Sequence, residues 1–106
     1  MALASFGKKT VTTAGTIVQV TTTPTNCNQL FIQALTANTG KIYIGLSTLV
    51  KATLVGALFV LPIPTANILP VYNPVAPVAD GAIDLATIWL DSDVNGEGVL
   101  ISYLVL

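Results

Sequence analysis

Apolar and polar residues alternate in short runs along most of the chain, a pattern typical of β-strands. The runs are rich in Thr, Val and Ile and are separated by Gly, Asn and Pro, and no amphipathic helical stretch appears. Strands are predicted over 10–22, broken at Ala14-Gly15, and as a hairpin over 29–47 with the turn TANTGK. Residues 48–61 fit either one short helix or two strands around Gly56, and we favour the strands.

The C-terminal part has the clearest pattern. The segments IDLATIWLD and GVLISYLVL are predicted strands, and they flank the acidic octet DSDVNGEG. Alternate positions of a strand point to opposite faces, and both faces of the last strand are largely apolar. One face carries Val99, Ile101, Tyr103 and Val105, and the other carries Leu100, Ser102, Leu104 and Leu106. In a two-layered protein one face fills the core, so the other needs a partner.

Between these regions lies a proline-rich segment, 62–81. Proline removes a hydrogen-bond donor, so this segment is not a central strand. Its apolar residues nevertheless favour burial, and two interpretations stay open: an extended arm on a neighbouring surface, or a long loop on its own domain. Residues 1–9 are a second candidate arm. The sequence therefore predicts one all-β domain over 1–106, an antiparallel sandwich or small barrel with a proline-rich extended segment.

Composition adds to this picture. Hydrophobic residues make up 53% of the 106 residues and charged residues only 8%, whereas globular domains average about 25% charged residues. The mean hydropathy is +0.79. A small domain has too little interior for so much apolar side chain, which indicates contact with copies of itself or a larger partner.

Membrane and nucleic-acid partners are not expected. No residue between Lys51 and Asp80 is charged, but five prolines interrupt this region, and a spanning helix needs about 20 apolar residues. The beginning of the chain, MALASFGKKT, does not have the pattern of a signal peptide. The four lysines are scattered and arginine is absent, whereas nucleic-acid binding requires clustered cations.

Candidate chemistry is limited to the acidic octet. The chain has one cysteine, Cys27, and no histidine, which disfavours zinc and Cys–His catalysis. We expect no enzymatic activity and no cofactor other than calcium. The octet matches the start of an EF-hand loop. At the later position where that loop has a bidentate Glu, this chain has Ser102. A plain hairpin tip is the favoured interpretation. If calcium binds, we expect millimolar affinity, and the candidate ligands are Asp91, Asp93, Asn95 and Glu97.

Two long segments, TVTTAGTIVQVTTTPTNCNQLFIQALTANTGKIYIG and DLATIWLDSDVNGEGVLISYL, resemble small β-rich virion proteins of tailed bacteriophages. The resembling features are the Thr-rich first strand, the Asn-Thr-Gly turn ending in Tyr-Ile-Gly, and Trp-Leu-Asp-Ser-Asp before a Gly-rich turn. The resemblance covers most of the chain except its proline-rich middle. It implies a capsid decoration, or cement, protein on the outer shell, often a homotrimer that braces the major capsid protein. It implies no catalytic residues.

From these observations we expect a structural virion protein that stabilises an assembled capsid. It would be located on the outer capsid surface, and in the host cytoplasm during assembly. The expected contacts are Ile68, Leu69, Val71, Tyr72, Leu100, Leu104 and Leu106. Two alternatives stay open. One is a tail, neck or head-fibre component, and the other is a carbohydrate- or calcium-binding host-attachment module that uses the octet and Trp89. Trp89 with Tyr103 could stack on a sugar or a base, but a core or interface aromatic pair across the hairpin is the favoured interpretation.

Overall fold

The chain is all-β in a computed structural model, which describes residues 2–75 and 83–105. Within these residues, ten strands form three antiparallel sheets, and one 3-10 helix lies between two of the strands. The strands are β1 (Ala2–Thr10), β2 (Val18–Gln19), β3 (Asn26–Cys27), β4 (Gln29–Ala34), β5 (Ile42–Val50), β6 (Val55–Leu61), β7 (Val71–Tyr72), β8 (Ile83–Asp84), β9 (Trp89–Ser92) and β10 (Gly98–Val105), and the 3-10 helix η1 is Leu85–Thr87. The predicted all-β fold class is confirmed.

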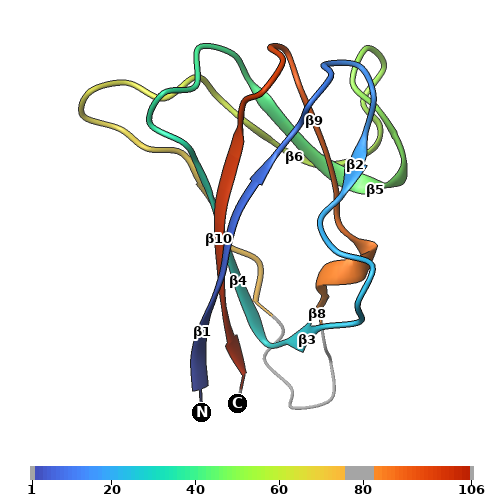
Figure 1. Cartoon of the computed structure of the whole chain (residues 1–106), viewed down its shortest axis with the longest axis vertical. Helices are drawn as coiled ribbons and strands as arrows, with labels where there is room; N and C mark the ends of the chain where they lie inside the picture. The colour runs from blue at the N-terminus through green and yellow to red at the C-terminus, as the bar shows by residue number, and fades with distance from the viewer. Residues whose placement is uncertain (1, 76–82, 106) are drawn as a thin grey trace.

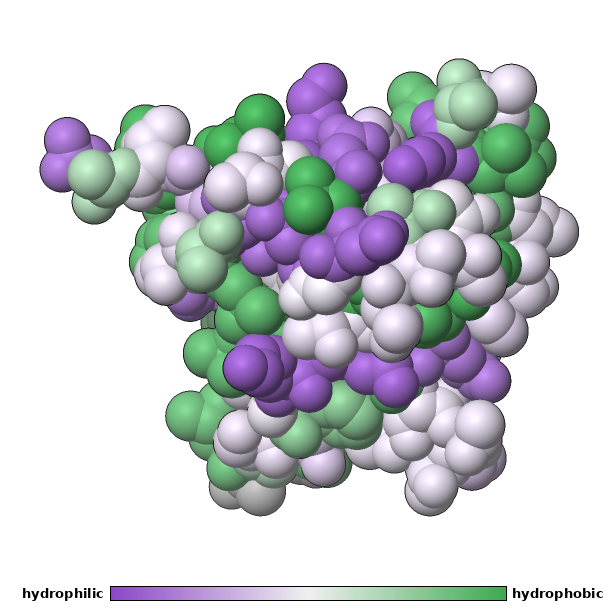
Figure 2. Space-filling view, turned by 45° about the horizontal axis from the view of Figure 1, so that its top comes forward, coloured by the Kyte–Doolittle hydropathy of each residue, from purple (hydrophilic) through white to green (hydrophobic). Residues whose placement is uncertain are grey.

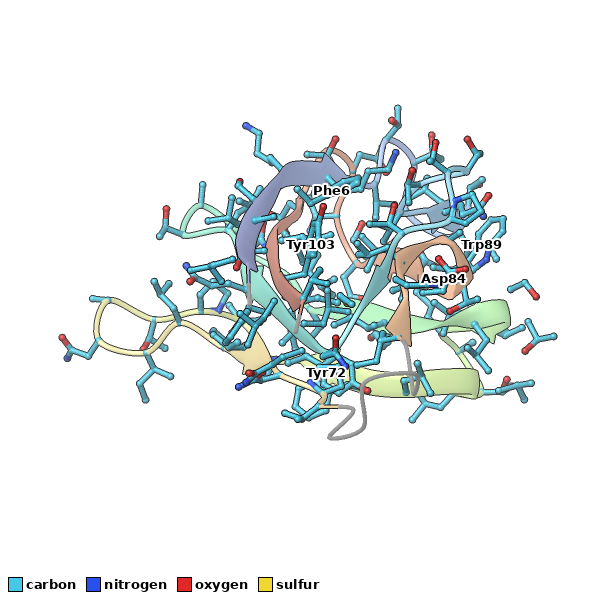
Figure 3. The ribbon with its side chains drawn as sticks, turned by 90° about the horizontal axis from the view of Figure 1, so that it is seen from below. Phe6, Tyr72, Asp84, Trp89 and Tyr103 are labelled. Carbon is cyan, nitrogen blue, oxygen red and sulfur yellow. The ribbon has the colours of Figure 1, made fainter. Side chains whose placement is uncertain are left out.

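Two four-stranded sheets face each other (Figure 1). The first sheet has the order β1-β10-β4-β7, and the second has the order β2-β9-β5-β6. A small third sheet pairs β3 with β8. Figure 3 shows β1 and β2 at one side of the molecule and β6 and β7 at the other. On that second side Phe59 and Tyr72 join the sheets, because their rings stack with centroids 4.9 Å apart.

The core lies between the two large sheets and is built by the alternation seen in the sequence. Strand β4 buries every second residue, and β10 buries Val99 and Ile101 on the same sheet. The facing sheet contributes Ile42, Ile44, Leu61 and Leu90, all fully buried. Each such side chain stabilises the fold by about 1.5–3 kcal/mol relative to exposure. The apolar face of β10 with Val99 and Ile101 is therefore the core face, as the pattern allowed.

Both predicted hairpins are wrong in their pairing. Strands β4 and β5 belong to different sheets, and so do β9 and β10. Residues 35–41 and residues 93–97 of the acidic octet are therefore connections between the layers. The physical reason is that both members of each pair carry apolar residues that need burial. A connection that passes from one sheet to the other lets the two strands bury their apolar residues from opposite sides of the core. Alternation of apolar residues does not identify which strand pairs with which.

Residues 48–61 are strands β5 and β6, as favoured from the sequence, but their turn is at 51–54 rather than at Gly56. Gly56 is required for another reason. Its φ is +73°, and a Cβ there would lie 2.5 Å from Thr48 Oγ1. Leu54, in the turn, also has a positive φ of 62°. The tip of this hairpin is therefore tightly folded around a left-handed backbone.

The two candidate arms have different outcomes. Residues 2–10 are strand β1, which pairs with β10 from Ala2↔Val105 to Thr10↔Gly98, so this segment belongs to the domain's own sheet. The predicted strand over 10–22 is mostly loop and contains only β2 and the last residue of β1, Thr10. In the proline-rich segment, 62–70 projects as a loop (Figure 1), and β7 pairs with β4. Residues 76–81 of that segment lie outside the described residues.

Candidate functional surfaces

The acidic octet lies at the end of the molecule where three connections between the layers meet. Its first residue, Asp91, is only 2% exposed although it is a carboxylate. Asp91 Oδ1 accepts hydrogen bonds from the backbone N–H groups of Gly15, at 2.8 Å, and Ser92, at 2.7 Å. A buried charge requires such donors. Asp91 therefore anchors the β1–β2 connection to strand β9.

Glu97 performs the same task for the β4–β5 connection. Its Oε2 accepts from Thr39 N and Thr39 Oγ1, at 2.6 and 2.9 Å, and its Oε1 accepts from Gly40 N at 2.9 Å. Burial acts to raise the pKa of Glu97, but these three hydrogen bonds outweigh it and hold the pKa below its usual value. Next to it, Asn38 Nδ2 donates a hydrogen bond to the Gly98 carbonyl at 2.8 Å.

The other two candidate ligands also have protein partners. Asn95 Oδ1 accepts from Ala14 N at 2.8 Å. Asp93 Oδ1 accepts from the Tyr43 hydroxyl at 3.1 Å and lies 3.7 Å from Lys51 Nζ. Burial, followed by the bond to Asp93, raises the pKa of Tyr43. The exposed ion pair contributes at most about 1 kcal/mol.

The structure does not bring the four candidate calcium ligands together. In the described part of the chain, no three acidic, cysteine or histidine side chains are grouped to hold a metal ion. Asp91 and Glu97 face different connections, and their oxygens accept N–H groups. The carboxylates of the octet therefore act as hydrogen-bond acceptors for the backbone N–H groups of neighbouring loops.

Trp89 and Tyr103 do not form the aromatic pair considered from the sequence. Trp89 belongs to the second sheet and pairs with Gln19 and Gly45, whereas Tyr103 belongs to the first sheet and packs against the core. Figure 3 shows the two side chains on separate ribbons. Trp89 is half-buried. The only stacked ring pair in the described residues is Phe59 with Tyr72.

Asp84 and Cys27 lie at the opposite end of the sandwich and have structural roles. Asp84 Oδ1 accepts from Thr25 N and Ala86 N, both at 2.9 Å, and these bonds lower its pKa. The carboxylate caps η1. Cys27 is buried, its Sγ donates to the Ile83 carbonyl, and burial raises the pKa of its thiol. The thiol therefore behaves as a small core residue.

The outer face of the first sheet carries exposed apolar side chains on paired strands, among polar residues such as Ser5, Ser102 and Gln29. Residues directly opposite in antiparallel strands share a face, so the pairing places Leu3 beside Leu104, and Leu100 between Lys8 and Gln33, with Val71 on the far side of Gln33. Leu3 is 72% exposed and Leu100 45% exposed. Phe31 and Leu104, on this face, are half-buried. Lys8 provides its one charged group among the paired positions. We call this surface the outer leucine face.

Two further groups of apolar side chains are exposed. One is the projecting loop, with Ile63, Ile68 and Leu69. The other is the β5–β6 hairpin, with Leu46, Val50, Leu54, Val55 and Leu58. Figure 2 shows hydrophilic residues spread over the middle of the face in view and hydrophobic ones gathered at the upper right, where this hairpin lies, and along the left margin.

The predicted contact residues divide into three groups. Ile68, Leu69, Val71 and Leu100 are exposed. Tyr72 and Leu104 are half-buried, Tyr72 through its stacking on Phe59. Leu106 lies outside the described residues. The sequence analysis missed Leu3, Val55 and Leu58. Leu3 was placed in an arm, and β6 was not recognised as an edge strand, because its neighbours depend on contacts between distant segments.

No family model, curated protein or solved structure matches this chain. Among the described residues, no helix is long and apolar enough to cross a bilayer, and no pocket is present in this part of the chain.

Proposed function

We propose that this protein is a structural component of a tailed-phage virion that binds the outer surface of the assembled capsid and stabilises it. The observation that supports this proposal is the exposed apolar surface, above all the outer leucine face. The resemblance to small phage virion proteins is the reason for proposing a phage capsid as the particle. Its partners are copies of itself and the major capsid protein.

The outer leucine face supports a docking role because its apolar side chains lie on a hydrogen-bonded sheet. Strand β10 is paired on both sides, with β1 and β4, so its backbone is fixed. Leu100 and Leu104 project from it on the side opposite Ile101. Burial of apolar area on a shell stabilises the shell by mass action, because the ligand binds only the assembled form. Standard interfaces bury about 800 Å² per partner.

The number of copies per particle tests the proposal. Particles purified from a culture that produces the phage would be analysed by quantitative mass spectrometry against the major capsid protein. Immunogold electron microscopy would locate the chain. Hundreds of copies over the head would support decoration. A dozen or fewer copies at the tail, neck or a fibre would contradict it and support the alternative virion position.

A substitution on the outer leucine face tests the docking surface. Leu100→Asp should abolish binding to capsids that lack the protein while leaving the fold intact, because Leu100 is 45% exposed. Leu104→Asp should act in the same way with a larger cost in stability, since Leu104 is half-buried. Thr22→Asp, an exposed loop residue outside this face, is the matched control. Full capsid binding by soluble Leu100→Asp and Leu104→Asp would exclude this face.

A further inference from the structure

Edge strands expose unpaired backbone groups, and proteins usually protect them against pairing with another chain. The two large sheets have four edges: β1 and β7 in the first, β2 and β6 in the second. Strand β2 has two residues, and β7 has two residues between Pro70 and Pro74. Such short or proline-bounded edges offer little backbone for pairing.

Strand β1 is long, but it is protected in another way. It carries Lys8 and Lys9, and its pairing with β10 shifts between Ser5 and Gly7. Gly7 has a positive φ of 104°. Charged residues and bulges both discourage edge-to-edge pairing, because a second strand would bury the charges and would meet a distorted backbone.

Strand β6 has no such charge. Its seven residues, VGALFVL, contain neither a charged residue nor a proline. Val55, Leu58 and Phe59 are 55%, 44% and 40% exposed. The pairing of β6 with β5 has two register shifts, one of which leaves Leu58 without a partner, and Gly56 has a positive φ of 73°, so the backbone of β6 is distorted as that of β1 is. The difference between the two long edges is therefore charge and exposed apolar area, and both favour pairing at β6.

The nearest charged side chain in sequence before β6 is Lys51, and it is engaged within the domain. Its Nζ donates to the Ser92 carbonyl at 2.7 Å and lies 3.7 Å from Asp93 Oδ1. Residues 52–61 are uncharged. Two copies of β6 brought together would therefore meet no like-charge repulsion along the strand. The same strand is present on every copy of the chain, so a second copy brings an edge of matching length and apolar character.

We propose that β6 is the interface between two copies of this chain, which pair their β6 strands antiparallel about a twofold axis. Pairing would join two second sheets into one continuous sheet and cover Val55, Leu58 and Phe59. Antiparallel pairing of identical strands is isologous, so both copies use the same edge. Because the other three edges are short or protected, the assembly closes at two copies. This inference holds whether or not the chain decorates a capsid.

Cysteine cross-linking tests the pairing and its direction. Single cysteines would replace Val55, Ala57, Leu58 and Phe59 in turn, and each variant would be oxidised and analysed on a non-reducing gel. The native Cys27 is buried and serves as the background. Leu3→Cys and Leu100→Cys, exposed on the outer leucine face, are the controls. Circular dichroism of each reduced variant confirms that it is folded, so a variant that fails to fold is replaced by its neighbours in the scan.

The account predicts disulfide-linked dimers that peak at one β6 position and fall on both sides of it, because only residues near a twofold axis meet their own copies. Equal cross-linking at all four positions would indicate parallel stacking and overturn the proposal. Cross-linking at Leu3 or Leu100 without any at β6 would also overturn it. Neither result would change the copy number in virions, so the proposed function is tested separately.

Discussion

The acidic octet and strand β6 differ in how far their side chains are satisfied within one chain. The octet contains three of the five acidic residues, and its carboxylates accept N–H groups of the β1–β2 and β4–β5 connections. Strand β6 has no charge and leaves Val55 and Leu58 in solvent. The region that resembles a binding site is thus internally complete. The uncharged strand β6 is the region whose apolar side chains are not covered within one chain.

This difference shows why charge density alone is a poor guide to function in a small β-sandwich. Connections between layers leave loop amides that no strand can pair, and buried amides need acceptors. Carboxylates at the ends of neighbouring strands provide them. Exposed apolar residues on a hydrogen-bonded edge have no such internal role, so they indicate an interaction with another chain.

The largest expected effect is at the octet. Asp91→Ala should lower the free energy of unfolding by about 2–3 kcal/mol, because Gly15 N loses a charged acceptor and a buried group is left unpaired. Urea unfolding at neutral pH measures it. Asp93→Ala is the control and should cost less than about 1 kcal/mol, because its ion pair is exposed. Equal losses in the two variants would contradict the anchoring role of Asp91.

The next effect sharpens the role of β6. Leu58→Lys should weaken self-association at least about tenfold, or about 1.4 kcal/mol, since two lysines would meet near the twofold axis. Sedimentation equilibrium measures it. Leu58 is 44% exposed, so the stability of the single chain should change by no more than about 0.5 kcal/mol. Leu3→Lys, on the outer leucine face, should leave the association unchanged, and an equal loss there would place the interface elsewhere.

The third effect depends on pH. Since the pKa of Glu97 is lower in the folded chain than its usual value, its stabilisation is present above the unfolded pKa of about 4.3. It is lost as pH falls through the folded pKa. Glu97→Gln should therefore be less stable than the natural chain at pH 7, by about 1–2 kcal/mol, and the difference should shrink below pH 4. Urea midpoints across this range test it, and a difference independent of pH would contradict the charged role.

The smallest expected effect is that of calcium. A millimolar site would gain about 1.4 kcal/mol at tenfold excess of calcium over the dissociation constant, which raises the melting temperature of a domain this size by several degrees. Because the octet carboxylates already accept backbone hydrogen bonds, we expect no rise and no binding heat in calorimetry. A clear rise with calcium but not with magnesium would restore the metal-site hypothesis.

Local features of the fold were predictable from the sequence, but neighbours were not. Alternation identified the β class, and it separated Val99 and Ile101 from Leu100 on the last strand. It did not distinguish a hairpin from a crossing connection, so β4–β5 and β9–β10 were paired wrongly. Turn residues such as Asn38 and Asn95 serve both kinds of connection, because their side-chain oxygens accept from loop amides in either.

The candidate site was predictable to a similar extent. Val71 was predicted as a contact only as an apolar residue of the proline-rich segment. The position of Leu100 on the face opposite Val99 and Ile101 followed from alternation. The position of Leu3 on the same face did not, because it depends on β1 pairing with the far end of the chain. For the octet, spacing alone predicted ligands. Only the positions of Gly15 and Thr39 show which donors its carboxylates accept.

The most direct test of the central claim is the native mass of the purified chain, measured by light scattering over a range of concentrations. The account predicts twice the chain mass of 11.0 kDa, because two β6 strands complete each other. A single-chain mass at every concentration would contradict the claim that β6 needs a partner. Three times the chain mass would contradict the twofold pairing and support the trimer that the phage resemblance implies.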